Sequence, residues 1–204
     1  AFMAIIVEHE KRKRKILEKA LDVFVEEGYE DVTFQKIADR CGITRTTLYI
    51  YFKNKREIFL WSIKQLVSGI ETTIMQIVNN TSFNTENCFR KMLMSIVDAI
   101  GENKKLFSVL LLYLIQLQKS GVDPRKRVMR RVIKLRHIMT TLLIRGAKSG
   151  EFKKINVKVV NDMFYGLIES AIFRLAVLAQ ENIDDIRDIL NFAVDGIIAK
   201  RSRT

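Results

Sequence analysis

The chain has 204 residues and a formal net charge of +12, from 35 Lys and Arg against 23 Asp and Glu. It contains one proline and nine glycines and no useful run of alternating strand pattern, so we expect an all-α protein. The length fits a small domain followed by a larger one. The two cysteines form neither a metal-binding spacing nor a disulfide framework, which favours a reducing cytoplasm.

Membrane and enzyme functions find little support in the sequence. The longest apolar run, residues 106–117, is too short to cross a bilayer and is interrupted by Ser108 and Gln116. His9 and His137 are far apart, and no glycine-rich phosphate loop, nucleophile elbow or metal-ligand cluster is present. We therefore expect a protein that is not an enzyme, with no cofactor, no metal and no membrane partner.

The first helix is predicted from Glu8 to Glu27, because apolar residues recur at helical spacing until Gly28 can end it in a left-handed conformation. Five consecutive cations, residues 11–15, lie at its start. They are explained equally well by a solvated helix end and by contact with phosphate groups.

Residues 33–55, TFQKIADRCGITRTTLYIYFKNK, predict two short helices joined by a tight corner. Thr33 is a suitable N-cap, and Gly42 can adopt the positive φ that the corner needs. Leu48 and Phe52 are expected to point into the core. That leaves Arg45, Thr46, Tyr49 and Ile50 outward, a surface suited to the DNA major groove.

The segment IADRCGITRTTLYIYFKNK closely resembles the DNA-binding signature of the TetR/AcrR family of bacterial transcription regulators. The resemblance is sharp over about residues 15–60 and diffuse beyond. It implies a three-helix helix-turn-helix domain, residues 8–54, followed by a larger helical domain, residues 55–204, that binds a ligand and dimerises. It also implies a regulator, expected here to be a repressor released from a palindromic operator by a small molecule. The alternative is a helical interaction protein without specific DNA readout.

The expected DNA contacts fall into two groups. Thr44, Arg45, Thr46 and Thr47 are candidates to read bases, with Arg45 suited to a guanine edge. In the family, the residues at the positions of Tyr49 and Lys55 touch backbone phosphates, and Thr33 is assigned the same role. Tyr51, like Ile50, is expected either to contact a sugar or to pack.

Further helices are predicted at about 55–79, 86–100, 103–119, 124–149, 157–179 and 184–200. The helix 157–179 is apolar on two sides, with Val160, Phe164 and Leu178 in one stripe and Phe173 opposite. A helix with two apolar faces needs two partners, so we expect a homodimer formed through the last two helices.

Ligand-binding residues are harder to assign. The candidates are Trp61, Phe89, Met92, Tyr113, Arg136, Met139, Phe164 and Arg174, with core packing the plainer explanation for the apolar members. Arg136 and Arg174 lie beside apolar stripes, so each needs an ion pair, a path to solvent, or the acidic group of an otherwise apolar ligand.

The positive charge is concentrated away from the expected DNA-binding segment. Residues 1–60 hold twelve Lys and Arg against ten Asp and Glu, whereas residues 119–154 hold twelve against two. In the helix 124–149 most of these cations oppose the apolar stripe, which indicates a solvated face. Net charge alone therefore does not locate the DNA-binding site.

Overall fold

The computed structural model describes residues 2–199, and the side chains of all of these except 2–6 and 127. The chain forms two compact units, Ala1–Glu71 and Thr72–Thr204. Within the described residues there are nine α-helices and a single isolated bridge in place of any strand, which confirms the all-α prediction. None of the described helices is both long and apolar enough to span a membrane. The boundary between the units falls inside α4 (Lys55–Val78).

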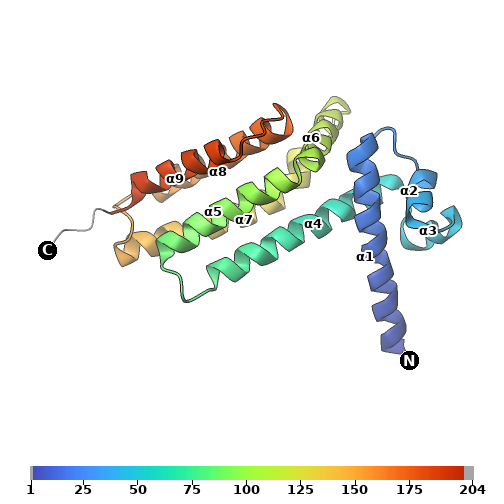
Figure 1. Cartoon of the computed structure of the whole chain (residues 1–204), viewed down its shortest axis with the longest axis horizontal. Helices are drawn as coiled ribbons and strands as arrows, with labels where there is room; N and C mark the ends of the chain where they lie inside the picture. The colour runs from blue at the N-terminus through green and yellow to red at the C-terminus, as the bar shows by residue number, and fades with distance from the viewer. Residues whose placement is uncertain (1, 200–204) are drawn as a thin grey trace. The chain divides into compact units, whose positions relative to one another are not determined.

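The first unit is built on α1 (Phe2–Glu27), against which α2 (Phe34–Cys41) packs, followed by α3 (Arg45–Tyr51) (Figure 1). Helix α1 begins earlier than the predicted Glu8 and ends before Gly28, whose φ of 82° confirms the left-handed end. Phe24 and Phe59 are fully buried and meet edge to face at 4.9 Å. Ser62 of α4 donates to the Leu17 carbonyl at 3.0 Å, which joins α4 to α1.

The second unit is organised around α5 (Thr85–Glu102), whose buried stripe includes Phe89, Met92, Leu93 and Ile96. It packs against α6 (Lys104–Lys119), α7 (Arg125–Ser149), α8 (Val157–Ala176) and α9 (Asp184–Ile197). Helices α5, α8 and α9 run alongside one another (Figure 1). A stripe that is apolar all along α5 explains why this helix is central.

The predicted ends of the last two helices need correction. Helix α8 stops at Ala176, and Leu178, predicted to be in the core stripe, is 62% exposed. Its amide donates to the Phe173 carbonyl, and Ala179 takes a φ of 52°, so the chain leaves the helix before Leu178 can turn inward. Helix α9 stops at Ile197, because the chain becomes extended and Ile198 forms an antiparallel bridge with Phe152. The predicted end at Lys200 lies outside the described residues.

A cluster of polar groups around Glu151 lies beside the start of α5. The Glu151 carboxylate accepts hydrogen bonds from the Glu86 amide at 2.9 Å and from the Ser149 hydroxyl at 2.9 Å. Burial opposes ionisation of Glu151, but these bonds and those from Thr85 outweigh it and lower its pKa below the usual range. The carboxylate thus satisfies an amide that the first turn of α5 leaves unpaired.

Glu151→Gln is expected to reduce the free energy of unfolding at neutral pH by about 1 kcal/mol, because bonds to a charged acceptor are replaced by neutral ones. A lowered folded-state pKa stabilises above the unfolded pKa, and this contribution is lost as pH falls through the folded value. Denaturant unfolding at several pH values should therefore show the two proteins converging on acidification. Glu102→Gln, at an exposed position, is the control. A constant difference down to acidic pH would contradict the assignment.

Candidate nucleic-acid interface

The corner between α2 and α3 is fixed by residues whose local roles the sequence predicted. The Thr33 hydroxyl accepts from the Lys36 amide at 3.2 Å and caps α2. Gly42 ends α2 with a φ of 68°, and its amide returns to the last turn. Thr44 then caps α3 by accepting from the Thr47 amide at 3.1 Å. Each helix therefore begins at a threonine cap, and Gly42 ends the first one two residues before the second cap.

The inner side of α3 is anchored by Leu48, which is fully buried, and by Phe52 just beyond the helix. Burying these two side chains turns the opposite side outward. Arg45 and Thr46 are exposed, Tyr49 is 49% exposed and Ile50 is 70% exposed. This is the outward set that the sequence predicted.

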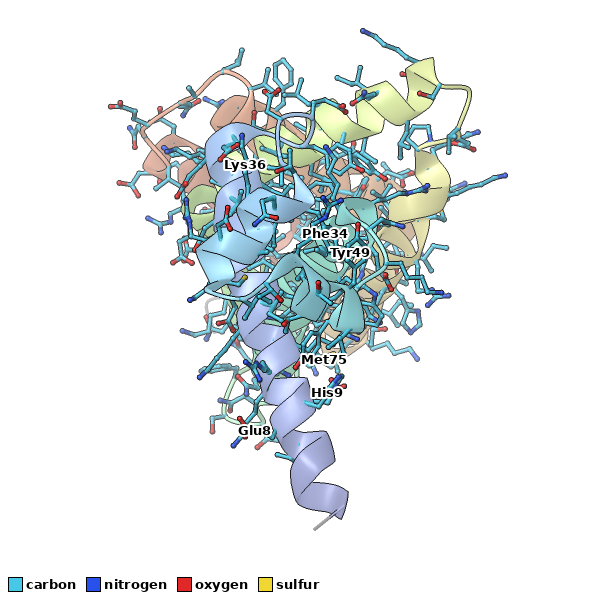
Figure 2. All side chains as sticks on the ribbon, turned by 90° about the vertical axis from the view of Figure 1, so that its right-hand side faces the viewer. Glu8, His9, Phe34, Lys36, Tyr49 and Met75 are labelled. Carbon is cyan, nitrogen blue, oxygen red and sulfur yellow. The ribbon has the colours of Figure 1, made fainter. Side chains whose placement is uncertain are left out.

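Tyr49 is held in place by its neighbours. Its ring stacks on the buried Phe34 of α2 with centroids 4.4 Å apart (Figure 2). Arg45, one turn earlier, donates to the Tyr49 hydroxyl at 3.2 Å. Phe34 was not singled out from the sequence, although its position next to the Thr33 cap and its aromatic character were available signals.

Tyr51 faces a different neighbour. Its ring stacks on His9 of α1 at 4.7 Å and is half-buried, so packing is the alternative that the structure favours for this residue. Thr44 and Thr47 bond to each other through their hydroxyls at 2.8 Å. Of the four predicted base readers, Arg45 and Thr46 are therefore the more available.

Lys55 occupies a position that its predicted phosphate contact does not explain. Its ammonium donates to the Glu30 carbonyl at 2.8 Å and to the Val32 carbonyl at 2.9 Å, and lies 4.9 Å from the centre of the Tyr29 ring. These bonds tie the start of α4 to the loop between α1 and α2. Next to it, the Asn54 carboxamide caps the Glu57 amide, and Glu57 returns to the Lys53 amide rather than to Asn54.

Some cations of the first unit form ion pairs with carboxylates, and others are exposed. Lys36 pairs with Glu27 and Arg40 with Glu26, so the exposed side of α2 is largely neutralised. The Glu26 hydrogen bond raises the pKa of Arg40 further above its ordinary value. In the run 11–15, Lys13 lies over the rings of Phe52 and Trp61, while the other four side chains are exposed. Arg45 and the exposed cations of this run would be available to an anionic DNA backbone.

Residues 16–60 match the model of a family described as bacterial regulatory proteins, tetR family. The matched segment contains the whole two-helix corner and the outward face of α3. Residues 16–60 therefore form a DNA-binding domain of the tetR family. The chain is a DNA-binding transcriptional regulator, as the sequence predicted, and its relatives are regulators rather than enzymes.

Relatives of the chain extend the similarity beyond the corner. The fatty acid metabolism regulator protein of Bacillus subtilis (strain 168) is 23% identical over 167 residues, 79% of this chain and 84% of that protein. Several other curated relatives are matched over about half of their own length or less.

Among solved structures, a TetR regulator from Haloarcula marismortui ATCC 43049 has a TM-score of 0.81 at 19% identity, covering 93% of this chain and 99% of that one. FadR of Bacillus subtilis, solved in complex with stearoyl-CoA, has a TM-score of 0.69 at 20% identity, covering 92% and 98%. At these identities the structures establish the fold of the chain and nothing beyond it.

The predicted ligand residues do not form one group. Phe89, Met92, Met139 and Phe164 are fully buried, and the rings of Phe89 and Phe164 meet edge to face at 4.9 Å. Tyr113 is also buried, on α6. Trp61 belongs to the first unit, where the ammonium groups of Lys13 and Lys64 lie 4.7 Å and 4.1 Å from the centre of its ring. Core packing therefore accounts for the apolar members.

The two arginines each have a structural partner. Arg136 forms an ion pair with Asp162 and lies 5.3 Å from the centre of the Tyr165 ring. Arg174 donates to the Gln180 carboxamide at 2.8 Å, which braces the turn between α8 and α9. Arg136 also lines a groove, together with the buried Asn161. Asn161 was missed because an asparagine in an apolar helix is ordinarily a surface residue.

Proposed function

We propose that the protein is a cytoplasmic repressor that binds a palindromic operator as a homodimer and leaves it when a small molecule binds. The observation that carries the DNA-binding part is the outward face of α3, where Arg45 and Tyr49 project from a helix whose inner side is buried. A short helix held in this way is suited to the major groove, with two copies reading half-sites one DNA turn apart, about 34 Å.

The proposed division of labour assigns bases to Arg45 and Thr46, with Thr44 and Thr47 in support. Tyr49 and Thr33 are proposed to hold phosphates, and Tyr51 to support α3 from behind. Lys55 is proposed to fix the α1–α2 loop as well as to meet a phosphate, because its two carbonyl partners leave one of its three N–H groups to donate.

Arg45→Ala is expected to weaken operator binding by about 1–3 kcal/mol at one base-pair position, because the guanidinium can form two bonds to a guanine edge. Lys55→Ala should instead weaken every duplex to a similar degree. Gel-shift titrations with single-base operator variants measure both effects. An equal loss for Arg45→Ala on all sequences would contradict the base-reading role.

Specific readout must also be separated from general affinity for DNA. A titration against random and palindromic duplexes at one salt concentration should give an affinity ratio of about a thousand or more. A ratio near one would favour a helical interaction protein without sequence readout.

The homodimer is proposed on an exposed apolar stripe of α8. Val159, Met163 and Phe173 of α8, with Val177 directly after its end, are 60%, 41%, 52% and 50% exposed. Together with the exposed Gly166 and Ser170 between them, these positions follow one another at alternating intervals of four and three residues. That interval is typical of helices that pack against helices of another chain. A Cβ at Gly166 would meet no atom of this chain, so the space beside it is open to a partner. Phe192 of α9, 81% exposed, extends the same kind of surface.

The effector is proposed to be an amphipathic small molecule with an acidic group. The curated relative regulates fatty acid metabolism, and the solved FadR binds stearoyl-CoA. Such a molecule can release DNA only if it binds more tightly to a conformation that does not fit the operator. Fluorescence anisotropy of labelled operator, titrated with acyl compounds of different head groups, tests this.

A further inference from the structure

A groove of about 580 Å³ lies between α7 and α8 in the second unit. Its apolar part is formed by Met129, Val132, Ile133 and Val157, of which Met129 and Ile133 are 45% and 58% exposed. This volume lies within the range of about 300–1,000 Å³ that is usual for small-molecule sites.

Asn161 of α8 lines this groove and is only 3% exposed. Its amide nitrogen donates to the Arg136 carbonyl at 2.8 Å and to the Thr140 hydroxyl at 2.7 Å. A backbone carbonyl can only accept, so the nitrogen must face it and the orientation of the carboxamide is fixed. The Asn161 Oδ1 atom is then left without a hydrogen-bond partner among the described residues. A buried acceptor in that state is unfavourable and needs a donor.

The charged groups around the groove are mainly positive. Lys158 is exposed in the first turn of α8, where free backbone amides also favour an anion. Arg136 and His137 line the same groove from α7. None of the described residues that line the groove is acidic, and the nearby Asp162 is paired with Arg136, so the charge of Lys158 is available to a ligand.

We infer that this groove binds an amphipathic acid whose polar end carries an N–H or O–H donor beside its acidic group. The apolar tail lies along Met129, Val132 and Ile133, the donor meets Asn161 Oδ1, and the anion meets Lys158. The inference rests on the proposed function in taking this ligand class as the effector, and it adds the donor that a simple fatty acid lacks.

A pair of ligands tests the donor directly on the unaltered protein. N-decanoylglycine has an amide N–H beside its carboxylate, whereas N-decanoylsarcosine has the same charge and chain but a methyl group in place of that hydrogen. Titration calorimetry below micelle-forming concentrations should give about tenfold tighter binding of N-decanoylglycine. Equal affinities for the two compounds, or no binding of either, would overturn the inference.

Variants then place the ligand in the groove. Lys158→Gln should weaken N-decanoylglycine several-fold, while Lys148→Gln, an exposed cation near the other end of α7, should leave its affinity unchanged. Asn161→Leu should abolish the preference for the glycine compound. If that variant fails to fold, the wild-type ligand pair and the two lysine variants still decide the question. Equal effects of the two lysine changes would overturn the location.

Operator titrations in the presence of the same compounds separate this inference from the proposed function. Selective binding of N-decanoylglycine that leaves operator affinity unchanged would support the groove site and contradict its role as effector site. Release of operator by other acyl compounds, without binding of N-decanoylglycine, would support the regulator and contradict the groove site.

Discussion

Phe173→Glu is expected to convert the proposed dimer into a folded monomer. The Phe173 ring is about half exposed in the single chain and belongs to the α8 stripe, so a carboxylate there would be buried without a partner when two copies meet. A monomer engages one half-site at a time, and operator affinity should fall by about two to four orders of magnitude because the second contact is no longer intramolecular. Light scattering and operator titration measure the two effects.

Leu112→Glu is the matched control for this change. Leu112 is 64% exposed on α6, outside the α8–α9 surface, so the same gain of charge should leave the molecular mass and the operator affinity unchanged. A monodisperse wild-type monomer at micromolar concentration would contradict the proposed dimer. A dimeric Phe173→Glu variant would move the interface elsewhere.

Phe164→Ala is expected to reduce the free energy of unfolding of the second unit by about 3–5 kcal/mol, because a fully buried ring is removed and a cavity remains. Phe164 lies edge to face with Phe89 at 4.9 Å, so the loss includes a ring contact as well as buried area. Denaturant unfolding with separate probes for the two units measures the change.

Leu112→Ala, which shortens an exposed side chain, should change the free energy of unfolding of the second unit by less than about 0.5 kcal/mol. If Phe164→Ala were equally mild, the ring would not be part of a packed core.

The sequence predicted the first unit in detail because its local signals agree with one another. The Thr33 cap, the positive φ of Gly42 and the burial of Leu48 are each set by a few neighbouring residues, and all three are found as expected. The all-α class and the positions of the helices followed in the same way from spacing and from glycine.

Features that depend on residues distant in the chain could not be predicted. The carbonyl partners of Lys55 lie 25 and 23 residues before it, and the position of its ammonium became visible only in the folded chain. The exposure of Leu178 depends on where α8 stops, and sequence periodicity gives that boundary poorly. Asn161 became notable only once its carboxamide was seen to be buried against Arg136 and Thr140.

The last turn of α7 contains a glycine, Gly146, that lies directly against the ring of Phe152. An ideal Cβ at Gly146 would lie 2.2 Å from the Phe152 ring, which is buried and also meets Phe89 edge to face at 6.0 Å. The backbone of Phe152 in turn pairs with Ile198 beyond α9. The ring can keep this place only while position 146 carries no side chain. During divergence, a residue larger than glycine at 146 therefore requires a smaller side chain at 152, whereas a smaller residue at 152 is compatible with Gly146.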